Sequence, residues 1–317
     1  MLGELLYQCL KPFLWVYDWL LWWWYRSRDQ REFLVLGHCV TVLPKDKGIS
    51  RELAVHRVHE PLATHLLSQV LEPGMNVVDV GSNIGYYVLV EARLIGPRGT
   101  VIAIEPVKEN VRQLLLNIQA NRYSNVLIHE LAISNRSGTA EIHVSQKSNW
   151  HSLGPVPWPT TKRRVPVSTL DDVLARYSLR CVDLVRMDLE GHEVTVMQGM
   201  HWTLSRYSPR LLVELHPHVI GAQPITEYLH TLQSLGYEVE WLFEQERDVP
   251  MRWRFVKVEK PAINELVNDP RICENPRALT VLFSKSTSER SPVKRANTGR
   301  RRQGMRPGAV DKTRVTL

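Results

Sequence analysis

Residues 76–105, NVVDVGSNIGYYVLVEARLIGPRGTVIAIE, constrain the fold of this chain more than any other segment. An apolar run at residues 77–80 ends in a turn from Gly81 to Gly85, and an apolar segment of helical length follows. A second apolar run stops at Glu105, 20 residues after Gly85. This order predicts a strand–turn–helix–strand unit. Glycines let the backbone approach a ligand that a Cβ would block, and a strand-end carboxylate can accept both hydroxyls of a ribose.

The spacing of the glycines distinguishes two kinds of nucleotide cofactor. Dinucleotide-binding turns read G-x-G-x-x-G and face a pyrophosphate, whereas this turn reads G-x-x-x-G with Asp79 two residues before it. A carboxylate repels a pyrophosphate and attracts a sulfonium or an ammonium group. The pattern resembles motif I of the S-adenosylmethionine-dependent methyltransferases. A strand–helix–strand unit that binds no cofactor is the alternative interpretation.

Strand-like and helix-like segments alternate along the chain, which predicts an α/β fold with a Rossmann-like, doubly wound sheet. We expect the sheet to be mostly parallel with an antiparallel edge strand, as in class I methyltransferases. The expected core strands are 77–80, 101–104, 126–129, 182–187, 210–215, 237–243 and 279–283. The expected helices include 60–72, 109–121, 170–177 and 225–235.

Composition divides the chain into three parts: a Trp-rich segment at 1–31, a catalytic domain at 32–285 and a basic tail at 286–317. The net charge of +7 belongs to the tail, because the residues before Ser284 hold 30 basic and 31 acidic side chains. A near-neutral body argues against a basic nucleic-acid groove. The tail lacks the large apolar groups that would offset the entropy of ordering, so we expect it to be disordered.

The first 25 residues contain five of the ten tryptophans, and Glu4, Lys11 and Asp18 lie seven residues apart on one helical face. Trp and Tyr favour the headgroup zone, so an amphipathic helix lying in the membrane surface is one interpretation. Packing of this helix on the domain or on a second subunit is the other. The four scattered cysteines suggest a reducing compartment, so we expect a cytoplasmic protein, with peripheral contact at the inner face of a membrane if the helix binds lipid.

A Pro-, Ser- and Trp-rich stretch at 145–164 reads as a loop. A long loop beside a cofactor domain is often a lid or a substrate wall. A surface insertion without a role in binding is the alternative.

Polar side chains gather at the ends of the predicted strands, where ligands bind in doubly wound folds. The residues at these ends are Asp79, Glu105, Asp188, Glu190, Glu214 and His216, and we expect several of them to converge near one crevice.

The motifs VVDVGSNIGYY, AIEP, LAIS, STLDDV, VDLVRMDLEGHE and LLVELHP occur in this order over roughly residues 55–285. In this combination the chain resembles the FkbM-family methyltransferases. The resemblance implies O-methylation of a hydroxyl on a sugar, a glycan or a small natural product, with S-adenosylmethionine as the cofactor. The Trp-rich segment and the basic tail lie outside the family pattern.

The groups of the cofactor suggest which residues hold it. Glu105 suits the ribose, Asp79 would balance positive charge, and Asp188 would face the methionine end or the transferred methyl group. The LAIS turn, with Ala132, resembles the adenine-side segment of the family. The full predicted cofactor site is Asp79, Gly81, Ser82, Asn83, Gly85, Glu105, Ala132 and Asp188.

Removal of the hydroxyl proton requires a base, which contributes on the order of 10²–10⁴-fold to such reactions. The candidates are Glu190, His192 and His216, and we expect Glu190 and His216, beside Asp188, to form the catalytic group. Glu190 instead capping the next helix, and His216 only bonding the sheet end, are the structural alternatives. A divalent metal on Asp188, Glu190 and Glu214 is a further possibility, although we expect no metal.

Two other functions compete with hydroxyl methylation. A nucleic-acid methyltransferase anchored by the basic tail is disfavoured, because the segment after the fourth strand reads MDLEGHE and lacks the Pro-Pro-aromatic motif of base-flipping amine methyltransferases. An inactive membrane scaffold is disfavoured by the intact set of Asp79, Gly81, Gly85 and Glu105. We therefore expect a small-molecule or glycan acceptor and no nucleic-acid partner.

Overall fold

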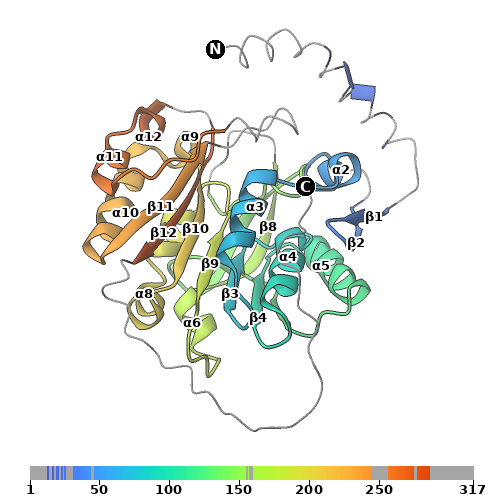
Figure 1. Cartoon of the computed structure of the whole chain (residues 1–317), viewed down its shortest axis with the longest axis horizontal. Helices are drawn as coiled ribbons and strands as arrows, with labels where there is room; N and C mark the ends of the chain where they lie inside the picture. The colour runs from blue at the N-terminus through green and yellow to red at the C-terminus, as the bar shows by residue number, and fades with distance from the viewer. Residues whose placement is uncertain are drawn as a thin grey trace.

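A seven-stranded sheet with the order β11-β12-β10-β9-β3-β4-β5 forms the centre of the computed structural model (Figure 1). The structure describes residues 31–43, 46–154, 156, 160–244, 256–274 and 277–285, with isolated positions between 13 and 25. Most of the Trp-rich segment and the whole tail at 286–317 lie outside the described residues. The strands are β3 (Asn76–Val80), β4 (Thr100–Ile104), β5 (Val126–His129), β9 (Leu184–Met187), β10 (Arg210–Leu215), β11 (Tyr237–Glu244) and β12 (Leu279–Lys285).

The predicted fold class is confirmed, but the antiparallel strand does not lie at the edge of the sheet. β12 pairs antiparallel with both β10 and β11, and β11 is the edge strand. The sequence of β12, LTVLFSK, is buried from Leu279 to Ser284, whereas β11 exposes Glu238. Alternate side chains of β12 pack into the apolar cores on the two faces of the sheet, which explains why the strand is buried on both faces.

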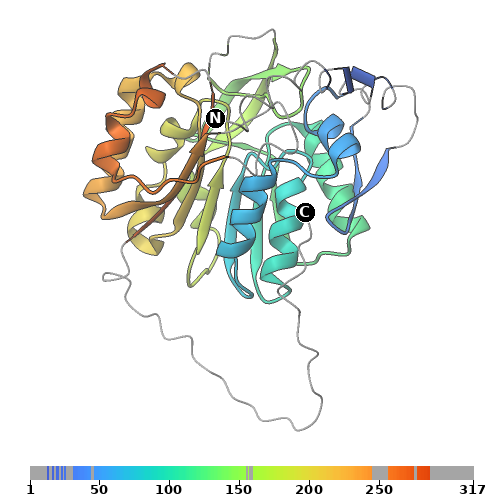
Figure 2. The same cartoon turned by 45° about the horizontal axis from the view of Figure 1, so that its top comes forward.

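Helices cover both faces of the sheet, because alternate residues of each strand point to opposite sides. The ribbon view shows helices on both sides of the central sheet (Figure 2). Val78 and Val80 pack with the helices on one face, and Val77 packs with those on the other. The first face is covered by α6 (Leu170–Leu174), α7 (Glu193–Met197), α8 (His201–Tyr207), α10 (Ala222–Ser234), α11 (Ile263–Val267) and α12 (Pro270–Glu274). The second face is covered by α2 (Ile49–His56), α3 (Pro61–Val70), α4 (Tyr86–Ile95) and α5 (Lys108–Ala120).

Two smaller sheets flank this core. β1 (Glu32–Val35) and β2 (His38–Thr41) form an antiparallel hairpin, and β6 (Ala132–Ile133), β7 (Gly138–Ser145) and β8 (Thr160–Ser168) form a three-stranded sheet. The loop predicted at 145–164 therefore extends too far, since β8 begins at Thr160. The first residues of β8 are mostly exposed and polar, and they pair with β7. Lys162 of β8 forms an ion pair with Glu141 of β7 at 3.4 Å.

The strands β3, β4, β9 and β10 are parallel, so their carboxyl ends lie on the same side of the sheet. The polar residues at these ends are therefore close together. The short helix α9 (Pro217–Ile220) follows β10 at this edge. Among the described residues, no helix combines the length and the apolarity needed to cross a bilayer.

Candidate active site

The turn between β3 and α4 requires both of its glycines, but for a reason other than the one expected from the sequence. Gly81 has φ +86° and Gly85 has φ +92°, a region that side chains with a Cβ rarely adopt. A Cβ on Gly81 would lie 2.2 Å from the carbonyl oxygen of Asp188, and one on Gly85 would lie 2.4 Å from Leu114 Cδ1. The glycines thus let the turn pack against β9 and α5. Gly81 lines the pocket described below, and Gly85 does not.

Glu105 ends β4 with its carboxylate inside the fold, 4% exposed. Its Oε2 accepts the backbone N–H of Asn83 at 2.9 Å, and its Oε1 accepts Val107 N–H at 2.9 Å and Asn110 Nδ2 at 3.2 Å. Burial raises the pKa of Glu105 to about 7 despite these donors. The donors fix the carboxylate at the pocket wall, and Oε2 keeps a lone pair for a ligand hydroxyl.

The two polar residues between the glycines, Ser82 and Asn83, have different roles. Ser82 Oγ donates to Asp79 O at 2.9 Å and accepts Ile104 N–H at 3.0 Å, so its hydroxyl ties β3 to β4. Asn83 has φ +51°, and its side-chain oxygen accepts Ile84 N–H at 2.6 Å. Both residues line the pocket, as predicted, and Asn83 also positions Glu105.

Asp79 does not line the pocket, which corrects the role expected for it. It is fully buried, and its Oδ1 lies 2.9 Å from Arg186 Nη1. Arg186 also reaches Asp188 Oδ2, at 3.3 Å. The neighbouring Glu91 is buried too, and burial together with the charge of Asp79 raises its pKa well above the usual value. The positive charge that Asp79 balances is therefore a side chain of the protein.

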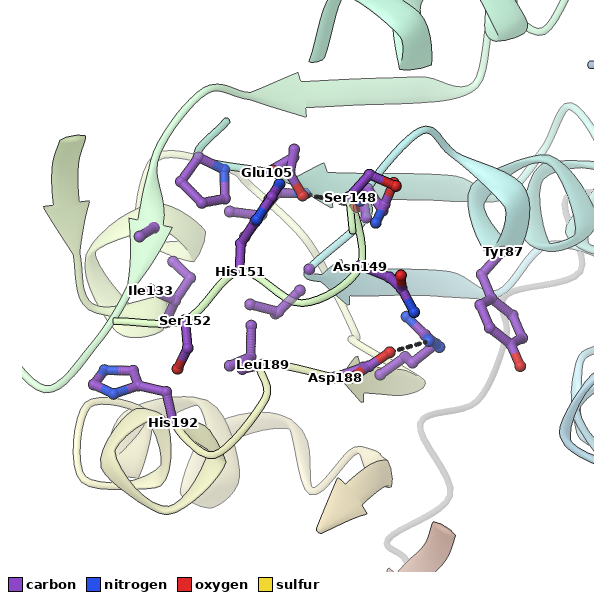
Figure 3. A pocket seen from close by; sticks show the side chains of 18 of the residues that line it. Tyr87, Glu105, Ile133, Ser148, Asn149, His151, Ser152, Asp188, Leu189 and His192 are labelled. Atoms are coloured by element: carbon purple, nitrogen blue, oxygen red, sulfur yellow. Dashed lines mark hydrogen bonds and ion pairs between the residues drawn. The ribbon is translucent and has the colours of Figure 1, made fainter. Parts of the chain in front are cut away.

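A pocket opens above the turn and the strand ends, with about 760 Å³ of space free of protein atoms (Figure 3). Six of the eight residues predicted for the cofactor site line it, together with Arg186, to which the sequence assigned no role. The predicted residues that line it are Gly81, Ser82, Asn83, Glu105, Ala132 and Asp188, and the apolar lining includes Ile49, Val80, Ile104, Leu131, Ile133, Ile142, Leu153 and Leu189.

The loop that precedes β8 forms one wall of the pocket, as the lid interpretation predicted. Ser148, Asn149, His151 and Ser152 all face the cavity. Asp46 anchors this loop: its Oδ1 accepts Ser148 N–H and its Oδ2 accepts Ser148 Oγ–H, both at 2.8 Å. The loop is therefore held to the segment before α2 by a buried carboxylate.

The end of the pocket next to Ala132 and Ile133 suits a neutral heterocycle. Burial lowers the pKa of His151 to about 4 and also lowers that of His192, so both imidazoles are uncharged near neutrality. His192 lies 3.0 Å from Ser134 Oγ, on the adenine side of the predicted site. This position takes His192 away from the Asp188 end, where a reacting hydroxyl would lie.

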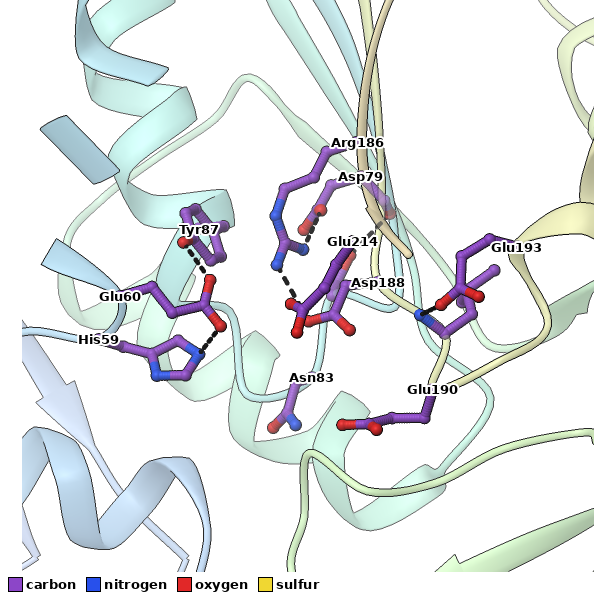
Figure 4. A network of polar contacts seen from close by, with 12 residues as sticks. His59, Glu60, Asp79, Asn83, Tyr87, Arg186, Asp188, Glu190, Glu193 and Glu214 are labelled. Atoms are coloured by element: carbon purple, nitrogen blue, oxygen red, sulfur yellow. Dashed lines mark hydrogen bonds and ion pairs between the residues drawn. The ribbon is translucent and has the colours of Figure 1, made fainter. Parts of the chain in front are cut away.

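The Asp188 end of the pocket borders a cluster of acids (Figure 4). Asp188, Glu190, Glu193 and Glu214 come from the ends of β9 and β10 and from α7. Burial raises the pKa of Asp188 well above its usual value, and the charge of Glu214 adds to the effect. Glu193 accepts Leu189 N–H at 2.9 Å and Gly191 N–H at 3.2 Å, so it shapes the loop after β9.

His216 lies at the back of this cluster and is fully buried. Its Nδ1 is 3.0 Å from Glu193 Oε1, and its Nε2 is 3.4 Å from both Glu190 Oε2 and Glu214 Oε1. Burial alone would lower the pKa of His216, but Glu193 and Glu190 outweigh it and raise the pKa well above the usual value. His216 is therefore a cation that holds three carboxylates together, and it does not fit the predicted role of base.

The three acids considered as a possible metal site, Asp188, Glu190 and Glu214, do not form a single ligand group among the described residues, and Glu190 lies 3.4 Å from His216. Two described groups have ligand atoms within 4.8 Å of one another: Asp188, Glu193 and His216, and Glu60, Asp188 and Glu214. In both groups a protein cation is already present. Arg186 contacts Asp188, and His216 contacts Glu193. We assign no metal to these residues.

Sequence reasoning missed His59 and Glu60, which lie before α3 and outside the recognised motifs. His59 lines the pocket beside Tyr87, and Glu60 lies behind it in the acid cluster (Figure 4). The local sequence His-Glu-Pro offered a signal for a helix start only. The fold alone brings these residues to the ends of β9 and β10.

The order of the strands and the mostly parallel sheet are those of the class I methyltransferase fold, and an acid, Glu105, directly follows β4. The family model of the methyltransferase FkbM domain matches residues 79–239, half of the chain. The chain therefore belongs to the FkbM methyltransferase family, as the motifs predicted, and its cofactor is S-adenosylmethionine.

Among curated proteins, the chain is 26% identical over 151 residues to Methyltransferase 1 of Beauveria bassiana, which covers 40% of the chain and 60% of that protein. It is 29% identical over 113 residues to protein-L-isoaspartate O-methyltransferase 1 of Arabidopsis thaliana, covering 35% and 45% respectively. The chain spans about half of the length of these curated relatives.

Solved structures of similar folds include methyltransferase FkbM from Methylobacillus flagellatus, at 15% identity and a TM-score of 0.41, covering 86% of this chain and 60% of that one. An rRNA methylase from Streptococcus thermophilus aligns at 11% identity and a TM-score of 0.42, covering 72% and 98%.

The residues present fit the cofactor of the family. The anchored carboxylate of Glu105 suits the ribose, and the apolar end with Ala132 and Ile133 suits the adenine. The acids around Asp188 suit the sulfonium and the ammonium group. In this assignment the sulfonium, which carries the transferred methyl group, would lie at the Asp188 end of the pocket, so the acceptor would approach there.

Proposed function

We propose that the protein transfers the methyl group of S-adenosylmethionine to a hydroxyl of a sugar, a glycan or a small natural product. The observation that carries this proposal is the excess of acids at the Asp188 end of the pocket. Five acids (Glu60, Asp188, Glu190, Glu193 and Glu214) are matched there by three cations, His59, Arg186 and His216. Carboxylates accept hydrogen bonds from hydroxyls, and Tyr87 adds an aromatic face.

The same acids disfavour anionic acceptors. A phosphodiester would meet like charge at the reacting end, so the described residues support neither RNA nor DNA as the acceptor. A carboxylate acceptor, such as the isoaspartate in the names of some relatives, would meet the same repulsion. A neutral polyol brings no charge into the cluster, and its several hydroxyls can each find an acceptor.

The chemistry of the step depends on alignment as well as charge. Bound cofactor supplies an electrophilic methyl group, and the residues of this chain place the acceptor oxygen in line with it. Glu105 would hold the ribose end, and the loop anchored by Asp46 forms one wall of the pocket. Arg186 orients Asp188 from below.

The test is methyl transfer from labelled S-adenosylmethionine by the full chain to a matched set of acceptors. The set holds neutral methyl glycosides, their 6-phosphates, an isoaspartyl peptide and an RNA oligonucleotide. We expect label in the neutral glycosides and at least tenfold less in the phosphates. Label confined to the RNA or to the peptide contradicts the proposal.

We also propose that the Trp-rich segment places the enzyme on a membrane surface, close to membrane-associated glycans. Its described helical positions expose Phe13, Trp19 and Trp23, at 74%, 52% and 62%. Amphipathic helices with such residues bind in the headgroup zone. The full chain should co-sediment with anionic lipid vesicles, and a Trp19→Ser/Trp23→Ser double variant should not. The control is Trp202→Ser on the body of the domain, and equal sedimentation of all three proteins would contradict the proposal.

A further inference from the structure

We propose that the Glu60 carboxylate is the base that removes the proton of the acceptor hydroxyl, with His59 and Glu52 as its positioning residues. This inference rests on the proposed function. The three residues lie before position 79, outside the segment that matches the family model.

The backbone of Glu60 has a conformation that needs support from its surroundings. Its φ of 44° and ψ of 68° place it in the left-handed region, which residues other than glycine seldom adopt. Such backbone strain persists where the surrounding contacts hold it, and it clusters at functional sites. Here the contacts come from the side chain: Oε1 lies 3.2 Å from His59 Nε2, and Oε2 accepts Tyr87 Oη–H at 2.7 Å.

His59 is held between two carboxylates. It is 7% exposed, and its Nδ1 lies 2.5 Å from Glu52 Oε2, while its Nε2 faces Glu60. Burial alone would lower the pKa of His59, but Glu60 and Glu52 outweigh it and raise the pKa well above the usual value. The side chain of Glu52 is 44% exposed, so the cluster extends from solvent to the active site.

The carboxylate of Glu60 lies behind His59 and Tyr87, next to the Asp188 end of the pocket. Its ligand-capable oxygen is within 4.8 Å of oxygens of Asp188 and Glu214. His59 and Tyr87, which bond Glu60, both line the pocket, and the Tyr87 ring lies 3.8 Å from the Arg186 guanidinium (Figure 4). A hydroxyl placed against Asp188 is therefore within reach of Glu60.

Charge distinguishes Glu60 from the acids around it. Burial alone would raise the pKa of Glu60, but the imidazolium of His59 outweighs it and holds the pKa below the usual range. The pKa of Asp188 is shifted the other way, chiefly by burial. Neighbouring groups whose pKa values are pushed apart divide the acid and base roles between them. Glu193 is occupied by backbone N–H groups, and Glu190 and Glu214 flank His216.

The reaction is a displacement at the methyl carbon of the cofactor. The hydroxyl oxygen forms a bond to the methyl carbon as the carbon–sulfur bond breaks, and that electron pair stays on sulfur, which becomes a neutral thioether. The hydroxyl proton passes to Glu60 and leaves to water when the methyl ether departs. Because the oxygen becomes strongly acidic as it is alkylated, a carboxylate with a lowered pKa is basic enough to take the proton.

The first arm of the test measures turnover by the full-length Glu60→Gln variant on the glycoside that the wild type methylates. We expect kcat to fall at least about 10²-fold, while affinity for S-adenosylhomocysteine stays within twofold. Glu60→Asp should recover part of the loss, and the exposed control Glu130→Gln should match the wild type. An unchanged kcat in Glu60→Gln overturns the inference. So does a wild-type activity that is lost with a metal chelator and restored by Mg²⁺, because the cluster would then hold a metal.

The second arm tests the positioning residues. His59→Gln removes the cation beside Glu60, which should raise the pKa of Glu60. In a plot of kcat against pH, the acid limb should therefore move to higher pH. The remaining groups that face Glu60, namely Tyr87, Arg186, Asp188 and Glu214, are unchanged in this variant. A profile that keeps its acid limb while kcat falls at all pH values would indicate a merely structural role for His59.

The third arm needs no acceptor. Nitrogen-15 spectra of the histidine side chains should show His59 doubly protonated at pH 7.5, and Glu60→Gln should lower its pKa. A neutral His59 at pH 7.5 overturns the inference. A wild type that binds S-adenosylhomocysteine and methylates nothing in the acceptor set contradicts the proposed function. In that case the protonation of His59, measured without an acceptor, still tests the inference about Glu60.

Discussion

Arg186 Nη1 lies 2.9 Å from Asp79 Oδ1, with the arginine side chain 7% exposed and the aspartate fully buried. The pair links β9 to β3 directly beneath the cofactor pocket. Motif I in this chain therefore serves the architecture as well as the ligand, because its acid holds the arginine that orients Asp188.

The Arg186→Met variant should lose about 3–5 kcal/mol of unfolding free energy, because it leaves Asp79 buried without its cation. Urea unfolding measures the loss. The control is Lys162→Met, which breaks the exposed pair with Glu141 and should cost less than about 1 kcal/mol. Similar losses in the two variants would contradict the buried-pair account.

Gly81→Ala and Gly74→Ala separate backbone strain from packing. Both glycines have positive φ, at +86° and +90°, but a Cβ meets the Asp188 carbonyl only at Gly81 and open space at Gly74. Both variants bear the cost of a left-handed alanine, and Gly81→Ala should lose about 1–3 kcal/mol more because of the overlap. Thermal unfolding compares them. Equal destabilisation would show that the close approach of the turn to β9 is unimportant.

The Asp46→Asn variant should loosen the loop that covers the pocket. The substitution replaces one of the two carboxylate oxygens that hold Ser148, and hydrogen bonds to charged groups contribute about 1.5–3 kcal/mol each. We expect faster proteolytic cleavage within residues 145–154 and faster release of S-adenosylhomocysteine, measured by stopped flow. The exposed Glu130→Gln variant serves as the control. If Asp46→Asn is cleaved no faster than the wild type, Asp46 does not anchor the loop.

Affinity for S-adenosylhomocysteine should rise with pH across neutrality. Burial raises the pKa of Glu105 to about 7, so the free protein holds a proton there at pH 6 and releases it by pH 8. The ribose hydroxyls donate to the ionised form, and binding should strengthen about tenfold between these pH values, as the ionised fraction does. Calorimetry at both pH values checks this. In the Glu105→Gln variant the affinity should no longer depend on pH. A wild-type affinity that stays constant or falls as the pH rises contradicts this prediction.

The cofactor half of the site was predictable from sequence because its residues are local. The turn from Gly81 to Gly85 and the acid at Glu105 lie within one strand–turn–helix–strand unit, where spacing alone sets their geometry. The fold class followed from the same alternation of elements. The place of β12 did not, because a mostly apolar sequence predicts a strand covered on both faces but does not show which strands lie beside it.

The acceptor half was less predictable because its residues interact across the fold. Asp79 was assigned to a ligand because nothing in the sequence shows that Arg186, 107 positions away, lies against it. His216 looked like a base from its ordinary pKa, and only the three carboxylates around it show that it is a cation. Glu60 belongs to no motif, and only the fold brings it beside Asp188 and Glu214.

The measurement that tests the account most directly is calorimetric titration of the full chain with S-adenosylhomocysteine, beside the Glu105→Ala variant. We expect micromolar binding by the wild type and a loss of at least about tenfold in the variant, since each hydrogen bond to a charged group contributes about 1.5–3 kcal/mol. No binding by the folded wild type, or equal binding by both proteins, would contradict the assignment of this pocket to the cofactor.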